Sequence, residues 1–202
     1  MKVLKIDSSP RSERSFSRRL TTHFTRSLGD VEIIERDLAQ SQIPYVTEDW
    51  VVGVWGPEEA QTDASRKAMA IAGPLVEEFL QADHIIIGAP MYNFGSPAVL
   101  KAYFDQIIQM GKLVKMEEGQ FVGLATTKSA TVVVTRGGAY SPGSGAEAYD
   151  HQEGHLRVIL GFIGITEVKF IYCENLASDE ASQNDAFEKA KVDIAAVATS
   201  LS

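Results

Sequence analysis

The chain contains a single cysteine, Cys173, in 202 residues, which excludes an intrachain disulfide and a zinc site built from cysteines. Cys173 ends an apolar predicted strand, which favours an inert core residue over a nucleophile. No apolar run approaches the ~20 residues that a membrane-spanning helix needs. Met1-Lys2 lead directly into a predicted strand rather than a signal sequence. We therefore expect a cytoplasmic protein without a membrane partner.

Basic residues are outnumbered, because 19 Lys and Arg stand against 27 Asp and Glu, for a formal net charge of −8. This balance argues against a general nucleic-acid-binding protein. The hydrophobic share of 45% and the charged share of 23% are ordinary for a soluble globular protein. The length predicts one domain, residues 1–202, with a core large enough to fold without metal or disulfides.

Several common nucleotide and metal motifs are also missing. No Gly-x-Gly-x-x-Gly follows the first predicted strand, which argues against a dinucleotide site, and no P-loop Gly-Lys-Ser/Thr occurs. His151 and His155 have the i, i+4 spacing of a helical metal pair, but Gln152 breaks the zinc-protease pattern and Gly154 weakens the local helix. We expect these histidines to be surface or interface residues and expect no metal.

The chain does contain apolar strands that alternate with amphipathic helices. Strands are predicted at 3–7, 32–37, 84–89, 130–135 and 168–173, and helices at 15–28, 63–81, 97–110, 148–162 and from 179 to the end. The alternation predicts an α/β protein, a parallel sheet with helices on both faces. Five strands favour the flavodoxin-like doubly wound order, and the less apolar strand 32–37 is expected at an edge.

Three segments depart from this alternation. Residues 38–62, which include Trp50 and Trp55, are predicted to form a long irregular segment of the kind that is functional or lid-like. Gly73-Pro74 is predicted to bend or interrupt the helix 63–81. Residues 112–124 are predicted to form an inserted β-hairpin.

The first of three polar loops follows the first strand and carries hydroxyls at Ser9, Ser15 and Ser17. The free N–H groups and the dipole at the start of a helix attract anions such as phosphate. The alternative is that Ser15 acts only as the helix N-cap.

Two further loops follow the third and fourth strands. Met91-Tyr92-Asn93-Phe94 places aromatic residues either side of an amide, a good lining for a flat heteroaromatic ring. Thr135-Arg136-Gly137-Gly138 allows the backbone to approach a flat ligand closely, although a plain turn is the alternative. Because the carboxyl ends of parallel strands share one edge of the sheet, we expect all three loops to meet at one ligand.

These residues resemble, in order and spacing and over essentially the whole chain, the FMN-dependent NADH-azoreductase family of flavodoxin-like quinone reductases. The resemblance implies noncovalent FMN, NADH or NADPH as electron donor, a ping-pong transfer of two electrons to quinones and azo compounds, and a homodimer with two interface sites. The residues that it assigns to FMN are Ser9, Ser15, Phe16, Ser17, Met91, Tyr92, Asn93, Phe94, Thr135, Arg136, Gly137 and Gly138.

The resemblance also implies roles. The serines hold the phosphate, and Asn93 hydrogen-bonds polar atoms of the ring. The N–H groups of Gly137 and Gly138 stabilise charge that develops on reduction near N1 and O2 of the flavin. No side-chain nucleophile is needed, since the cofactor carries the chemistry.

The inserted hairpin departs from the family pattern. Many relatives carry aromatic residues there, whereas this chain has Val114 and Met116, which predicts a wider acceptor pocket. Tyr140 and Phe162 are further candidates for this pocket, and the segment with the two tryptophans is a candidate replacement wall. The alternative is that these aromatic residues form core or dimer contacts.

Two other functions remain open at this point. A flavodoxin-type one-electron carrier would dock protein partners, but the long segment and the inserted hairpin favour an enclosed small-molecule site. A flavodoxin-like domain without flavin is disfavoured by the three intact loops. Three residues are candidates to meet the 2′-phosphate of NADPH: Arg14, Arg18 and Arg19.

Overall fold

The computed structural model describes residues 1–201 and contains a five-stranded parallel sheet of order β2-β1-β3-β6-β7. Its strands are β1 (Lys2–Asp7), β2 (Glu32–Asp37), β3 (His84–Pro90), β6 (Ser129–Thr135) and β7 (Glu167–Cys173). The main helices are α1 (Phe16–Ser27), α3 (Asp63–Gln81), α4 (Ala98–Ile107), α5 (Gln152–Phe162) and α6 (Glu180–Leu201). The predicted flavodoxin-like α/β fold is confirmed.

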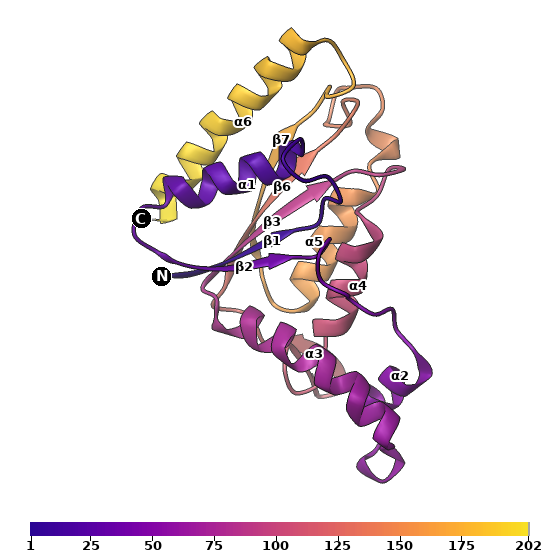
Figure 1. Ribbon diagram of the computed structural model, residues 1–202. Helices are drawn as coiled ribbons and strands as arrows, with labels where there is room; N and C mark the ends of the chain where they lie inside the picture. The colour runs from indigo at the N-terminus through magenta and orange to yellow at the C-terminus, as the bar shows by residue number, and fades with distance from the viewer. Residues whose placement is uncertain (202) are drawn as a thin grey trace.

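Helices cover both faces of the sheet (Figure 1). Helices α1 and α6 lie on one face, and α3, α4 and α5 on the other. Successive strand residues face opposite ways, so Val3 and Ile86 pack under α1 and α6 while Leu4 and Ile85 pack under the other three helices. The central strands β3 and β6 are mostly apolar because both of their faces are buried.

Strand β2 lies at an edge of the sheet, as predicted, and its sequence explains the position. Its sequence, Glu-Ile-Ile-Glu-Arg-Asp, has four charged residues in six, and none of the six is fully buried. Charged side chains are tolerated where only one neighbouring strand is present.

The prediction of a long irregular segment at 38–62 is wrong in part. Residues Glu48–Trp55 form a helix, α2, which begins at the N-cap Thr47 and packs along α3, and a short 3-10 turn follows at Glu58–Ala60. The segment lacks a strong helical pattern, and contact with α3, including burial of Trp50, stabilises it instead.

Helix α3 runs through Gly73-Pro74, so the predicted interruption is wrong, while the alternative of a bend stays a prediction. The helix begins at a capping box of Thr62 and Ser65. It buries Leu75, Val76 and Phe79 beyond the proline. This burial outweighs the single hydrogen bond that a proline removes.

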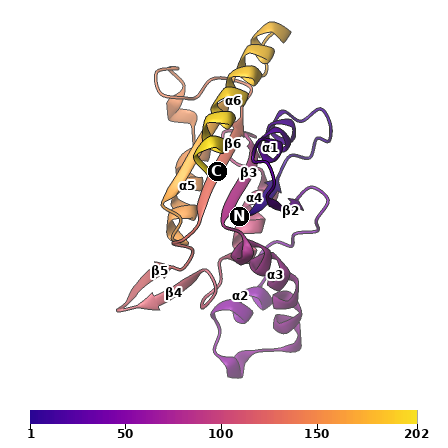
Figure 2. The same cartoon turned by 90° about the vertical axis from the view of Figure 1, so that its left-hand side faces the viewer.

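The inserted hairpin is confirmed as β4 (Val114–Glu117) and β5 (Gln120–Gly123), which project from the body of the molecule (Figure 2). The turn residues Glu118 and Gly119 both have positive φ, as a tight two-residue hairpin turn requires. At its base, the Gly123 backbone touches the turn after α5 so closely that a Cβ there would lie 2.2 Å from Gly164 N.

Helix α5 begins at Gln152 rather than at 148, because Asp150 accepts hydrogen bonds from the N–H groups of Gln152 and Glu153.

At the amino end of the sheet, the start of β1 and the end of α6 lie side by side (Figures 1 and 2), and Val3 and Leu201 belong to one apolar cluster.

Candidate functional site

Ser15 starts the helix that borders the site. Its Oγ accepts a hydrogen bond of 3.4 Å from Arg18 N and lies 3.1 Å from Ser17 Oγ. Both serines are buried, as is Ser9 across the loop. In the first turn of α1, the N–H groups of Phe16 and Ser17 have no intrahelical acceptor. The N-cap interpretation of Ser15 is therefore confirmed, and the same helix start offers free donors to an anion.

Arg18 holds this loop from behind. Its guanidinium donates to Ser9 O over 2.7 and 3.2 Å and pairs with both carboxylate oxygens of Asp37. The hydrogen bond from Arg18 holds the pKa of Asp37 below its ordinary value. Arg19 lies over the rings of Phe16 and Phe187 instead. Arg18 is thus committed to Asp37 and Ser9.

The second loop makes a very tight turn. Tyr92 and Gly95 exchange two backbone hydrogen bonds, of 2.9 and 3.1 Å. The residues between them, Asn93 and Phe94, have φ values of +47° and +69°. Asn tolerates this left-handed conformation, whereas Phe at the second position is unusual and stores backbone strain. Phe94 packs its ring between those of Tyr140 and Tyr149.

In the third loop, Arg136-Gly137-Gly138, every backbone carbonyl oxygen accepts a hydrogen bond. The oxygens of Arg136, Gly137 and Gly138 accept hydrogen bonds of 3.0, 2.9 and 3.3 Å from backbone N–H groups of the loop after β7. The donors are Leu176, Ala177 and Asn175, in that order. The N–H groups of Gly137 and Gly138 find no acceptor within residues 1–201. Hydrogen bonds thus fix the peptide units of this loop, while the N–H groups of Gly137 and Gly138 stay available as donors.

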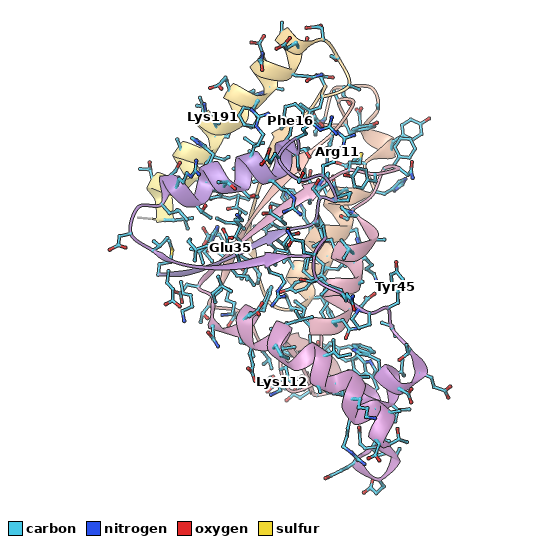
Figure 3. All side chains as sticks on the ribbon, viewed as in Figure 1. Arg11, Phe16, Glu35, Tyr45, Lys112 and Lys191 are labelled. Atoms are coloured by element: carbon cyan, nitrogen blue, oxygen red, sulfur yellow. The ribbon has the colours of Figure 1, made fainter. Side chains whose placement is uncertain are left out.

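These loops meet at one pocket of about 330 Å³ at the carboxyl edge of the sheet. Its lining residues are Ser9, Arg11, Ser15, Phe16, Pro90, Met91, Tyr92, Thr135, Arg136, Gly137, Leu176 and Ala177. Figure 3 shows Arg11 and Phe16 beside each other at the start of α1. The predicted meeting of three strand-end loops is thus found.

Sequence reasoning missed a fourth loop. Leu176 and Ala177 follow β7, whose carboxyl end lies at the same edge of the sheet as the other three. The rule that ligands lie at strand ends applied to this segment too, but its small apolar residues carry no chemical signal. Arg11, in the first loop, also lines the pocket; the sequence favours a solvated charge there, with contact to a phosphate as the alternative.

Four predicted residues occupy the right loops without lining this pocket: Ser17, Asn93, Phe94 and Gly138. Tyr140 lies against the α-carbon of Gly138, where an added Cβ would meet its ring at 3.3–3.4 Å. Tyr140 and Phe94 thus form an aromatic edge beside the pocket.

The other predicted acceptor-pocket residues lie elsewhere in this chain. Val114 is fully buried in the main core. Phe162 packs against Phe121 of the hairpin, and Phe121 against Trp55 of α2, so these three rings form an aromatic cluster that is partly exposed. Met116 is exposed on the hairpin. The tryptophan segment therefore packs on the hairpin side and forms no wall of the pocket.

The titratable groups nearby offer no nucleophile. Cys173 is buried, which raises the pKa of its thiol to about 11 and confirms its predicted core role. Among residues 1–201 no cluster of three or more His, Cys, Asp or Glu side chains is placed to hold a metal ion. No helix in the same described range has the length and apolarity to span a bilayer.

A larger hollow, of about 710 Å³, runs along α1 and β2 and is lined mostly by charged residues. Size alone would favour it as the site. Its main charges are already paired, however, as in Lys5–Glu35, Arg18–Asp37 and Arg36–Glu78. We therefore place the site at the smaller pocket, where hydrogen-bond donors are unused.

Comparisons with known proteins identify the family of this chain. The model of the family described as "Flavodoxin-like fold" matches residues 1–198. The chain is 39% identical over 198 residues to an FMN-dependent NADH:quinone oxidoreductase of a Nostoc species, with 96% of each chain covered. It is 42% identical over 183 residues to the enzyme of that name from Nostoc punctiforme, with 89% of each covered. A crystal structure of an azoreductase from Bacillus anthracis superposes with a TM-score of 0.89 at 28% identity, covering 98% of each chain.

Proposed function

Because this chain belongs to the family with the flavodoxin-like fold, we propose that it is an FMN-dependent NADH:quinone oxidoreductase. The relatives that carry this name match nearly end to end, so no domain of theirs is missing from the comparison. The observation that carries the proposal is the meeting of four strand-end loops, with unused N–H donors, at one pocket.

The residues present fit FMN. The buried hydroxyls of Ser9 and Ser15 and the free N–H groups at the start of α1 suit the phosphate. The N–H groups of Gly137 and Gly138 suit polar atoms at the edge of a flat ring. A side chain at Gly137 would enter this space, because its Cβ would find only the Ala177 Cβ within 4 Å, at 3.5 Å.

The protein's own contribution is binding, orientation and charge stabilisation. When bound, FMN supplies hydride and electron transfer between NADH and the acceptor. The N–H groups of Gly137 and Gly138 would hold the polar edge of the ring and would stabilise negative charge there. The Asn93 amide, held in its turn by the Tyr92–Gly95 hydrogen bonds, is the second polar group that we assign to the ring.

Three finer features belong to the same proposal. NADH and the quinone react in turn, in a ping-pong cycle, as the four loops offer them one pocket. Azo compounds are accessory acceptors, by similarity to the azoreductase structure. The enzyme is a cytoplasmic homodimer, and the exposed cluster of Trp55, Phe121 and Phe162 is the apolar surface that association would cover.

The test is an anaerobic titration of FMN-loaded protein with NADH, followed in the visible spectrum, and then a pulse of benzoquinone. We expect the flavin absorbance to bleach with NADH and to return with the quinone. Bound FMN that NADH does not bleach would contradict the proposal, and so would a folded protein that never binds FMN. Initial rates with both substrates varied should give parallel reciprocal plots; intersecting lines would reject the ping-pong order.

A further inference from the structure

Arg136 lies in the segment that sequence reasoning assigned to FMN, but its side chain is committed elsewhere. The side chain has no solvent exposure at all. Its NH2 group donates to Asp150 over 2.7 Å, NH1 to Glu174 over 3.1 Å, and Nε to Gln152 Oε1 over 3.4 Å. The guanidinium also lies over the ring of Tyr172, 5.4 Å from its centre. Each of the three guanidinium nitrogens therefore has a partner within the protein.

Arg136 and its partners connect three of the four loops of the site. Gln152 donates its amide hydrogens to the carbonyls of Ala89 and Pro90, over 3.1 and 3.2 Å, and so attaches to the end of β3. Glu174, directly after β7, also accepts from Tyr140 N and Ser141 Oγ, both over 2.8 Å. One buried cation therefore joins the ends of β3, β6 and β7.

We propose that Arg136 is a positioning residue that holds the Gly137–Gly138 peptide units in the orientation that presents their N–H groups to the cofactor. The inference rests on the proposed function, because FMN is the ligand to which these donors are assigned. The resemblance assigns Arg136 to FMN binding, whereas in this proposal its side chain acts on the loop, and Gln152 and Glu174 have supporting roles that nothing in the sequence pattern indicated.

The N–H groups of Gly137 and Gly138 keep their orientation only if both the carbonyl oxygens of this segment and the loop after β7 are held in place. Their carbonyls are held by the loop after β7, through Leu176, Ala177 and Asn175. That loop follows Glu174, which Arg136 holds by an ion pair of 3.1 Å. Loss of the guanidinium would leave two carboxylates, with side chains only 12% and 14% exposed, facing each other without a cation. Their repulsion would displace both loops at once.

The test begins with protein free of flavin, so that it does not depend on the proposed function. Backbone amide exchange, measured by mass spectrometry, reports on residues 135–138 and 174–178 in wild type, Arg136→Lys and Arg136→Met. We expect exchange in both segments to be about tenfold faster in the variants. The control is Arg66→Met, which removes an exposed arginine that pairs with Asp63 at the start of α3 and, within residues 1–201, makes no hydrogen bond or ion pair with these loops.

The second measurement compares the affinities of oxidised and reduced FMN. A positioning role predicts weaker binding of FMN by about tenfold in Arg136→Lys, with a greater loss for the reduced form, because the donors favour its negative charge. The flavin potential then becomes more negative. A general loosening of the fold would weaken both forms equally and would leave the potential unchanged.

The outcomes separate the two proposals. A folded Arg136→Lys protein with wild-type exchange, affinity and potential would overturn the positioning role. Faster exchange with no FMN binding even in wild type would overturn the proposed function and leave only loop fixation by Arg136. If Arg136→Met does not fold, Glu174→Gln removes one charge and keeps the guanidinium buried with Asp150; an unchanged potential in that variant would likewise overturn the inference.

Discussion

Ser15 and Thr62 are both N-cap residues, but only Ser15 lies beside the pocket. Replacing either by alanine removes an acceptor for a backbone N–H and should cost about 1 kcal/mol of unfolding free energy. Ser15→Ala should also weaken FMN binding by about tenfold, through the lost phosphate contact. Urea unfolding and flavin fluorescence titration measure the two effects. Equal flavin affinities in Ser15→Ala and Thr62→Ala would remove Ser15 from the phosphate site.

His84 makes stability depend on pH. Burial lowers its pKa from 6.5 to about 4, with nearby Lys169 adding to the effect, and its ring nitrogens contact Ser129 Oγ at 2.7 Å and Thr131 Oγ1 at 3.1 Å. Because the folded pKa lies below the unfolded one, the unfolded state takes up the proton first. Stability should therefore fall as pH drops from about 6.5 to about 4.

The size of this effect is about 3 kcal/mol, since one pKa unit corresponds to about 1.4 kcal/mol. The measurement is the unfolding free energy of wild type and His84→Gln at pH 7 and pH 4. The difference between the two proteins should change over this range, and an NMR titration of His84 checks its pKa directly. Parallel pH curves for both proteins would contradict the assignment.

For single residues, the sequence predicted which ones lie near the pocket better than it predicted what each of them does. Ser15 and Gly137 both line the pocket, where their types and positions place them, and their contacts with FMN stay predictions. The role of Arg136 depends on Asp150, Glu174 and Gln152, which become its neighbours only when the chain folds. Such partners are distant in the sequence, so a local sequence pattern cannot predict them.

The inserted hairpin depends on one close contact between backbones. A Cβ at Gly123 would lie 2.2 Å from both Ile163 C and Gly164 N, and neither backbone atom can move aside cheaply. Gly123→Ala should therefore destabilise the protein by about 1–3 kcal/mol. Thermal or urea unfolding measures the cost.

The matched control for this change is Gly154→Ala in α5, where an added Cβ meets nothing within 4 Å. There the lost backbone freedom of the unfolded chain should raise stability by about 0.5 kcal/mol. A Gly123→Ala protein as stable as wild type would show that the hairpin base can shift without cost.

Elements were predictable where their own pattern decides them. The five strands and the hairpin follow from apolar runs and turn residues, and all were found. Helix α2 was missed because its contact with α3 stabilises it, and an interruption of α3 was expected because the burial of residues beyond Pro74 is not visible in the local sequence. The sequence likewise shows Val114 and Phe162 as apolar residues, but only packing places one in the core and the other in an exposed cluster.

Association of two chains is the property that we predict for the whole molecule. Phe121→Asp places a charge in the exposed cluster with Trp55 and Phe162 and should convert a dimer to monomers, because burying an unpaired carboxylate is costly. Val192→Asp, at a residue 69% exposed on α6, is the control and should remain dimeric. Sedimentation velocity distinguishes the two. A monomeric wild type, or a dimeric Phe121→Asp protein, would reject this surface.

The neighbouring ends of the chain have a practical consequence for engineering. Because β1 begins beside the end of α6, at the edge of the sheet opposite the pocket, a short flexible linker would join Lys2 to Leu201. New termini opened in the exposed turn at Glu118-Gly119 would then give a circularly permuted chain that leaves all four pocket loops covalently intact.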